Sequence, residues 1–191
     1  MADAGVNGRV SDEEVIAVTE FGHRLEEAAL NLPEPEPIVH NGDRMPFVFV
    51  ADDAFGTTEN LLKPYGGDKL DHNQRLFNYR LSRARQVSEN AFGILSSRFL
   101  VFRSPIQLAP EKAATTTIAS CYLHNFLRKK SKQYLRLDSV NQEDVNHEIH
   151  PGDWREQQHR IESLSTCRSR NIGMVARCVR DSFREYFCAQ R

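Results

Sequence analysis

Residues 47–53 read FVFVADD, a continuous apolar run from Phe47 to Ala51 that ends at two aspartates, Asp52 and Asp53. A turn signal, Asn41-Gly42-Asp43, precedes the run. A short apolar run with β-branched residues and flanking turns is typical of a strand that is buried on both faces. In open α/β sheets, sites tend to form at the carboxyl ends of strands. The sequence therefore predicts a buried strand that presents Asp52 at a site.

A long helix is predicted downstream of this strand. Asp71 and Gln74 have the spacing of a capping box, which marks the helix start. Gly93 costs about 1 kcal/mol relative to alanine inside a helix, so it predicts close packing against a neighbour. Six mostly apolar residues of this helix alternate by four and three, which places them on one face: Phe77, Leu81, Ala84, Ser88, Ala91 and Leu95.

Three further segments flank these elements. Residues 12–30 predict one amphipathic helix, which the prolines between 33 and 37 end. Residues 99–102 predict a short extended piece. Pro110 suits the first turn of a helix that runs to about Lys130, and we expect His124 on it to be a packing residue rather than a base. The predicted apolar face of this helix holds Ala114, Ile118, Cys121, Tyr122 and Phe126.

The last third of the chain is more polar. Residues 132–160 predict a loop or a partly disordered insertion that Trp154 anchors. Residues 171–187 predict a final helix with one apolar side, formed by Met174, Val175, Cys178, Val179 and Phe183. Together with the buried strand and the long helices, these segments indicate an α/β fold class.

Composition and charge limit the function classes. The 191 residues are 40% hydrophobic, with a net charge of −1, which fits one domain with a real core. No apolar run has the length of a signal peptide core or a membrane helix, and the four cysteines lack metal-site spacing. Between Lys69 and Arg103 seven basic residues face two acids. A second basic cluster follows at Arg128, Lys129, Lys130, Lys132 and Arg136, so local patches can attract phosphates.

Two acids form a candidate metal site on chemical grounds. Asp52 ends the predicted strand and Glu89 lies 37 residues later, on the basic long helix. Carboxylates are the ligands that Mg²⁺ prefers. The ordinary alternative is that Asp52 or Asp53 satisfies turn amides and that Glu89 pairs with Arg85 one helical turn earlier. Spacing alone leaves both interpretations open and favours the ordinary one.

Several long motifs resemble one family. The stretch FVFVADDAFGTTENLLKPY at 47–65 resembles the second-aspartate motif of the PIF/Harbinger DDE transposases. NQRLFNYRLSRARQVSENAFGILSSRF at 73–99 is similar to that family's block with the catalytic glutamate, and CYLHNFL at 121–127 to the helix that follows it. The opening segment 11–37 and the ending VRDSFREYF at 179–187 resemble the family too. The resemblance covers most of residues 11–187.

The resemblance implies an RNase H-like nuclease fold that binds a divalent metal, Mg²⁺ or Mn²⁺, and cleaves DNA strands. It matches Asp52 to the second catalytic aspartate and Glu89 to the catalytic glutamate, both as metal ligands, with Asp53 ranked below Asp52. Three arginines beside Glu89 are candidate DNA contacts: Arg80, Arg83 and Arg85. The family also implies a location in the nucleus and a Myb/SANT-like DNA-binding protein as partner.

The sequence also departs from the family pattern. It offers no counterpart of the family's first catalytic aspartate, and Gly56-Thr57 replaces the usual Pro-Leu. We therefore expect a fold that is incomplete at its N-terminus, with long helices after the retained strand. The expected division is a tail at 1–10, a partial DDE nuclease domain at 11–130, a polar loop at 131–160 and a C-terminal helical segment at 161–191, packed on the domain. We expect no independent catalysis; the alternative is a domesticated or degenerate module that binds DNA or protein.

Overall fold

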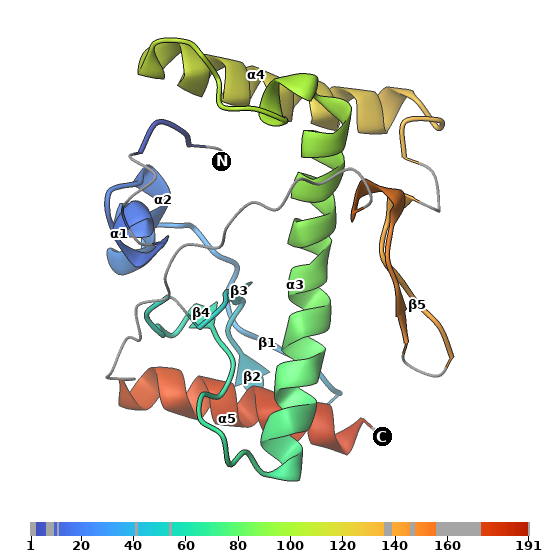
Figure 1. Ribbon diagram of the computed structural model, residues 1–191. Helices are drawn as coiled ribbons and strands as arrows, with labels where there is room; N and C mark the ends of the chain where they lie inside the picture. The colour runs from blue at the N-terminus through green and yellow to red at the C-terminus, as the bar shows by residue number, and fades with distance from the viewer. Residues whose placement is uncertain are drawn as a thin grey trace. The chain divides into compact units, whose positions relative to one another are not determined.

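The computed structural model describes residues 3–6, 10, 12–40, 42–53, 55–135, 139–145, 148–155 and 173–190. Its architecture is mixed and rich in helix, with small sheets, and is compatible with an α/β fold (Figure 1). The helices are α1 (Asp12–Ala17), α2 (Glu20–Glu26), α3 (His72–Arg98), α4 (Pro110–Lys130) and α5 (Met174–Ala189). The strands are β1 (Glu36–Pro37), β2 (Arg44–Met45), β3 (Phe49–Val50), β4 (Leu61–Leu62), β5 (Gln142–Glu143) and β6 (Ile149–His150). Short 3-10 helices cover Leu100–Phe102 and Asp153–Arg155.

The chain divides into two compact units. The first unit contains residues 1–7 and 86–163, and the second contains residues 8–85 and 164–191. The 27-residue helix α3 contributes to both units, because the boundary at residues 85 and 86 falls inside it. The two units are described separately below, and the predicted boundaries at residues 10, 130 and 160 stay predictions.

The core of the second unit surrounds a short parallel strand pair. β3 pairs with β4, with Phe49 opposite Leu61 and Val50 opposite Leu62. Leu62, Tyr65, Phe77 and Leu81 form the buried cluster, and two phenylalanines of α5 pack against it, Phe183 and Phe187. Asp52 and Asp53 follow β3 after one residue, the buried Ala51, so this core positions the two aspartates.

The strand predicted at 47–51 is shorter and less buried than expected. Only Phe49 and Val50 pair as a strand, Ala51 is buried, and the side chains of Phe47 and Phe49 are partly exposed. The Phe49 ring lies edge-on to Phe21 of α2, with the ring centroids 5.0 Å apart. Within the described residues, β4 is the one strand paired with β3. The prediction of burial on both faces is therefore wrong, because Val48 and Val50 pack against the core while Phe47 and Phe49 stay partly exposed.

The single helix predicted at 12–30 is in fact two helices. Thr19 interrupts it: its hydroxyl donates a hydrogen bond to the Ile16 carbonyl at 2.8 Å and accepts one from the Gly22 amide at 3.1 Å. A Cβ at Gly22 would lie 1.9 Å from the Ile16 carbonyl oxygen, so the tight turn requires glycine. A threonine cap competes with helix continuation, and the apolar periodicity used for the prediction does not register this competition.

Helix α3 has the predicted start and the predicted close contact. The Gln74 amide donates to the Asp71 carboxylate at 2.7 Å, and the Asp71 amide donates to Gln74 Oε1 at 3.0 Å. This reciprocal pair confirms the capping box. Within the first unit, a Cβ at Gly93 would lie 2.3 Å from the ring of Trp154, which is itself buried. The contact between Gly93 and Trp154 therefore accounts both for the close packing at Gly93 and for the anchoring role of Trp154.

Helix α4 has the predicted bounds but a different buried face. Ser120 and His124 are buried, whereas Tyr122 is 71% exposed and Phe126 is also exposed. The Ser120 hydroxyl donates to the Thr116 carbonyl at 2.8 Å, so this small polar side chain is satisfied within the helix and can pack inward. His124 Nδ1 lies 2.8 Å from the Tyr134 hydroxyl, which confirms it as a packing histidine. The segment before α4 is a 3-10 helix rather than the extended piece predicted at 99–102.

The C-terminal third is more regular than a polar loop. β5 and β6 pair antiparallel, with Gln142 opposite His150, and the predicted loop at 132–160 thus contains a hairpin. Residues 156–160 lie outside the described residues, as does the start of the helix predicted at 171–187.

The buried residues of helix α5 are Ala176 and Arg180. Of the side predicted from its apolar residues, Phe183 packs against the core, whereas Met174 is 83% exposed. The arginine is accommodated because its guanidinium stacks 4.0 Å from the centroid of the Tyr65 ring. The charged side chain of Arg180 can therefore lie on the buried face of α5. In the described part of the chain, no helix has the length and apolar character that crossing a membrane requires.

Candidate functional site

The candidate site lies at the carboxyl edge of the β3–β4 pair. Because the two strands are parallel, Asp52 after β3 and Lys63 after β4 leave the sheet on the same side. Lys63 is only 6% exposed, and its ammonium donates a hydrogen bond to the Phe55 carbonyl at 2.8 Å. Lys63 therefore ties the turn that follows Asp53 to β4. Lys63 was not predicted as a site residue, although a signal was present: it directly follows the apolar Leu61-Leu62 pair, as Asp52 directly follows the apolar run 47–51.

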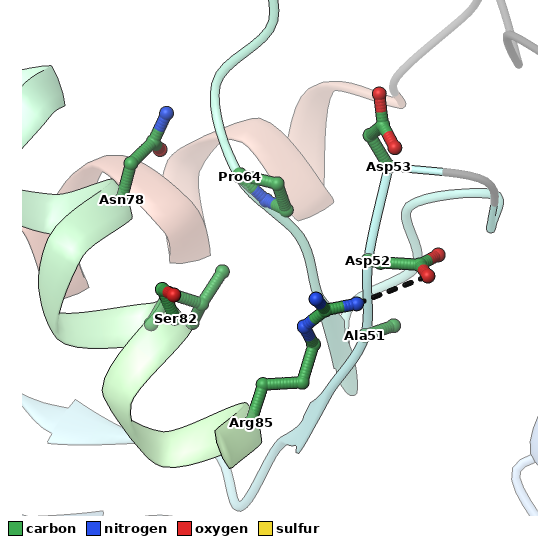
Figure 2. A pocket seen from close by; sticks show the side chains of 8 residues that line it. Ala51, Asp52, Asp53, Pro64, Asn78, Ser82 and Arg85 are labelled. Atoms are coloured by element: carbon green, nitrogen blue, oxygen red, sulfur yellow. Dashed lines mark hydrogen bonds and ion pairs between the residues drawn. The ribbon is translucent and has the colours of Figure 1, made fainter. Parts of the chain in front are cut away.

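A cavity of about 290 Å³ opens beside these acids. Figure 2 shows the two aspartates on the stretch that leaves β3, with α3 facing them. The Asn78 side chain of α3 holds the opposite loop, because it accepts a hydrogen bond from the Tyr65 amide at 2.8 Å and donates one to the Tyr65 carbonyl at 2.9 Å. The residues that line the cavity are Ala51, Asp52, Asp53, Pro64, Asn78, Leu81, Ser82 and Arg85.

Arg85 reaches into this cavity and pairs with Asp52. Its Nη1 lies 3.1 Å from Asp52 Oδ2, and the side chains are 38% and 32% exposed, respectively. On α3, Arg85 continues the stripe of Phe77 and Leu81, which face the core. A helix turns by about 100° per residue, so four-residue steps keep these side chains on one face. The fold thereby brings an arginine to the acid that follows β3.

The other two candidate DNA-contacting arginines lie on a different face of α3. Arg80 donates to the Gln190 carbonyl at 3.4 Å, and Arg83 donates to the Tyr79 hydroxyl at 3.3 Å. Arg80 and Arg83 are exposed, whereas Arg85 is half-buried. The three arginines therefore do not form one phosphate-facing row, and their role in DNA contact stays a prediction.

Glu89 belongs to the first unit, where it pairs with a residue from the segment after α4. Arg155 Nη2 lies 3.7 Å from Glu89 Oε2, and both side chains are 44% exposed. The neighbouring Asn90 side chain accepts hydrogen bonds from the Trp154 indole and the Asn141 amide, each at 3.1 Å. Asn141, Trp154 and Arg155 thus contact the part of α3 that carries Glu89. Because Asp52 belongs to the second unit, its convergence with Glu89 on one metal stays a prediction.

The acids that line the cavity are of the chemical type that binds hard divalent cations. Asp52 and Asp53 supply carboxylate oxygens at one cavity wall, and Mg²⁺ or Mn²⁺ binds through one or two carboxylates with several waters. Among the described residues, no three acids, histidines or cysteines gather into a metal-binding group. The Arg85 guanidinium contacts one oxygen of Asp52, so an arginine already pairs with the carboxylate that a cation would use.

A buried tyrosine fixes the loop on the other side of the cavity. Burial, assisted by a hydrogen bond that its hydroxyl donates to Asp181, raises the pKa of Tyr65 to about 12. Arg180 stacks on the same ring, and Arg184 Nη1 lies 3.5 Å from Asp181 Oδ1. These α5 contacts hold Tyr65, and with it Pro64 at the cavity wall. In the sequence, the helical spacing of Arg180 with Ala176, Phe183 and Phe187 indicates that it lies on the packed side of α5.

Comparison with known proteins identifies the family at a coarse level. The family model described as DDE superfamily endonuclease matches residues 1–125, about two thirds of the chain. No curated protein and no solved structure matches the chain significantly. The matched region contains the whole β3–β4 pair, both cavity aspartates and Glu89 on α3. The resemblance seen in the sequence is therefore confirmed at the superfamily level, and the chain belongs to the DDE superfamily endonucleases, a family of transposase-type nucleases.

Proposed function

We propose that this chain is a transposase-derived, divalent-metal-dependent DNA nuclease domain of the PIF/Harbinger type, with an RNase H-like fold. Asp52 and Glu89 are the metal ligands in this proposal. Its main support is that Asp52 leaves the carboxyl edge of a parallel strand pair and lines a cavity together with Asp53. Acids at that edge are where an α/β nuclease needs its cation-binding oxygens.

The proposed chemistry is hydrolysis or strand transfer at a phosphodiester. A bound Mg²⁺ or Mn²⁺ would supply activation of water and stabilisation of the leaving oxygen. Asp52 would hold the cation. Lys63 would keep the turn after Asp53 in place through the Phe55 carbonyl, and Asn78 would hold the facing loop at Tyr65. DNA is the substrate that the nuclease family suggests.

We also propose that this chain alone does not cleave DNA. The resemblance matches only Asp52 and Glu89 to the family's catalytic acids, and a two-metal site loses its geometry without the remaining acid. Incubation of supercoiled plasmid with the purified chain and Mn²⁺ is therefore expected to leave the plasmid intact. Nicking that is lost in Glu89→Gln would contradict this part of the proposal.

Metal binding is tested directly by calorimetry. Mn²⁺ is titrated into the wild-type chain, Asp52→Asn, Glu89→Gln and the matched neighbour Asp53→Asn, with circular dichroism as a folding control. We expect a binding isotherm for the wild type, loss of binding in Asp52→Asn and Glu89→Gln, and a smaller effect in Asp53→Asn. Unchanged affinity in Asp52→Asn would show that this carboxylate is not a ligand. Loss in Asp52→Asn without loss in Glu89→Gln would remove Glu89 from the site.

A second candidate function is a non-enzymatic module that binds DNA or a partner protein in the nucleus. The observation that favours it is on α4, where Tyr122, Leu123 and Phe126 are exposed just before a basic end. A Myb/SANT-like DNA-binding protein is the proposed partner. In fluorescence anisotropy with labelled duplex DNA, binding without any Mn²⁺ isotherm would favour this candidate. A fluorescent fusion that stays out of the nucleus would contradict both functions.

A further inference from the structure

The ion pair between Arg85 and Asp52 sits at the point where a metal would bind. Figure 2 shows the Arg85 side chain rising from α3 to meet the Asp52 carboxylate at the cavity wall. The guanidinium lies 3.1 Å from Oδ2 and both side chains are about one-third exposed. A planar guanidinium matches a carboxylate and carries its charge at any pH of interest. Arg85 is thus a cation that the protein itself supplies to its proposed metal ligand.

The fold positions the Arg85–Asp52 ion pair, and solvent reaches both side chains, so the two partners can separate. Phe77 and Leu81 anchor the preceding turns of α3 in the core, so the stem of Arg85 leaves the helix toward β3. A fully buried pair would be costly to separate, because one charge would remain buried and unpaired. A pair that water reaches is worth little net stabilisation, since solvent screens it. Separation of Arg85 from Asp52 is therefore accessible to a ligand that binds either partner more strongly.

We propose that Arg85 is an exchangeable counter-cation: it holds Asp52 in the metal-free protein and moves to a DNA phosphate when a divalent cation takes its place. This inference rests on the proposed function, and it adds how that site is regulated. Arginine binds phosphate as it binds carboxylate, through paired N–H donors. The same side chain thus has an alternative anionic partner when its acid is engaged by metal.

The exchange couples the two ligands of the site. Metal binding releases Arg85 for DNA, so metal raises the affinity for DNA. By linkage, DNA raises the affinity for metal by the same factor. A rival arrangement keeps Arg85 on Oδ2 while the cation uses the other Asp52 oxygen. In that arrangement Arg85 does not compete, and it even helps to orient the carboxylate. The two arrangements predict opposite effects of removing the guanidinium.

The first test is Mn²⁺ calorimetry on the full chain. Arg85→Gln removes the competitor, and Arg83→Gln is the matched control, because it removes the same charge from the other face of α3. We expect Arg85→Gln to bind Mn²⁺ about two- to fivefold more tightly than the wild type, in keeping with the modest strength of a solvent-reached ion pair. Arg83→Gln is expected to change the affinity less. Arg85→Lys keeps the positive charge and is expected to restore weaker binding.

The outcomes separate this inference from the function on which it rests. Asp52-dependent binding that is equal or weaker in Arg85→Gln would overturn the exchange while leaving the metal site intact. Equal tightening in Arg83→Gln and Arg85→Gln would also overturn it, because the effect would then be general electrostatics. No isotherm in any variant would remove the proposed metal site and the exchange with it. Circular dichroism, together with Arg85→Lys, guards against a simple folding defect.

The second test measures the coupling. A labelled duplex oligonucleotide is titrated with each variant by fluorescence anisotropy, at fixed ionic strength, without and with Mn²⁺. In the wild type we expect Mn²⁺ to tighten DNA binding. In Arg85→Gln we expect a smaller gain, because only the contact of the cation itself with phosphate then remains. Arg83→Gln is expected to weaken DNA binding equally with and without Mn²⁺. The same Mn²⁺ gain in Arg85→Gln and in the wild type would overturn the transfer of Arg85 to phosphate.

Discussion

Gly93 stands inside α3, where alanine would ordinarily stabilise a helix by about 1 kcal/mol. Here a Cβ would lie 2.3 Å from the Trp154 ring, so the contact opposes the propensity. Overpacking of this kind typically costs about 1–3 kcal/mol, and we expect Gly93→Ala to lower the free energy of unfolding. Urea denaturation measures it, with the exposed Ser88→Ala on the same helix as the control. A more stable Gly93→Ala protein would show that Trp154 does not pack there.

Tyr65 is the residue whose ionisation the fold changes most clearly. Its pKa is raised from 10.0 to about 12, first by burial and then by Asp181. The neutral phenol is therefore favoured in the folded state. The contribution of this raised pKa to the free energy of unfolding is fully present below about pH 10. It is lost as the pH rises from there toward 12, because Tyr65 ionises first in the unfolded chain.

Tyrosinate absorbance during an alkaline titration tests this shift. Of the five tyrosines, one is expected to ionise last, and the Tyr65→Phe variant is expected to lack that step. The variant also loses the hydrogen bond to Asp181, which we expect to cost about 1–2 kcal/mol of stability at neutral pH. Tyr186→Phe is the control on the same aromatic surface, since its ring packs against Phe187. A late ionisation that persists in Tyr65→Phe would assign the raised pKa to another tyrosine.

At the scale of elements, the start of α3 depends on its reciprocal cap. Asp71→Ala removes the acceptor of the Gln74 amide hydrogen bond, and loss of such a cap costs about 1 kcal/mol. We expect this loss in thermal or urea unfolding. Asp68→Ala removes an equal charge three residues earlier, outside the cap, and is expected to be nearly neutral. Equal losses in the two variants would mean that charge, rather than the hydrogen bond, stabilises the helix start.

Helix bounds were easier to predict from the sequence than buried faces. Asp71 and Pro110 act within a few residues of chain, so local signals located the starts of α3 and α4. Which side of α4 or α5 packs depends on distant partners: Tyr134 for His124, and Tyr65 for Arg180. Apolar periodicity cannot show that a histidine or an arginine will find such a partner. It pointed instead to Tyr122 and Met174, which the structure exposes.

For the candidate site, too, some features could be predicted from the sequence and others required the folded structure. Its acids were recognised through motif resemblance, and the position of Asp52 at the end of a strand followed from the apolar run before it. The pairing of Arg85 with Asp52 required the packing of α3 on the β3–β4 pair, 33 residues apart in sequence. Helical spacing alone instead favours Glu89, one turn later on α3, as the partner of Arg85. The structure gives Glu89 an ion pair with Arg155, from a segment interpreted as a polar loop.

At the scale of the whole molecule, α3 contributes to both compact units, while the chain's one tryptophan, Trp154, lies in the first. Most helical stability in proteins comes from tertiary packing, so loss of α3 in one unit removes packing surface from the other. We expect urea unfolding monitored by Trp154 fluorescence and by far-UV circular dichroism to give the same midpoint. We also expect Asp71→Ala, in the second unit, to lower both midpoints. Two separate midpoints would mean that the units unfold independently.

The Arg85–Asp52 pair also bears on how such a domain can change over evolutionary time. Under the proposed function, a lineage in which Asp52 mutates to a neutral residue would lose a metal ligand, yet it would keep Arg85 at the same place on α3. The cavity wall then carries more positive charge and attracts nucleic acid more strongly. A single substitution would therefore both weaken a nuclease site and strengthen DNA binding at the same cavity wall.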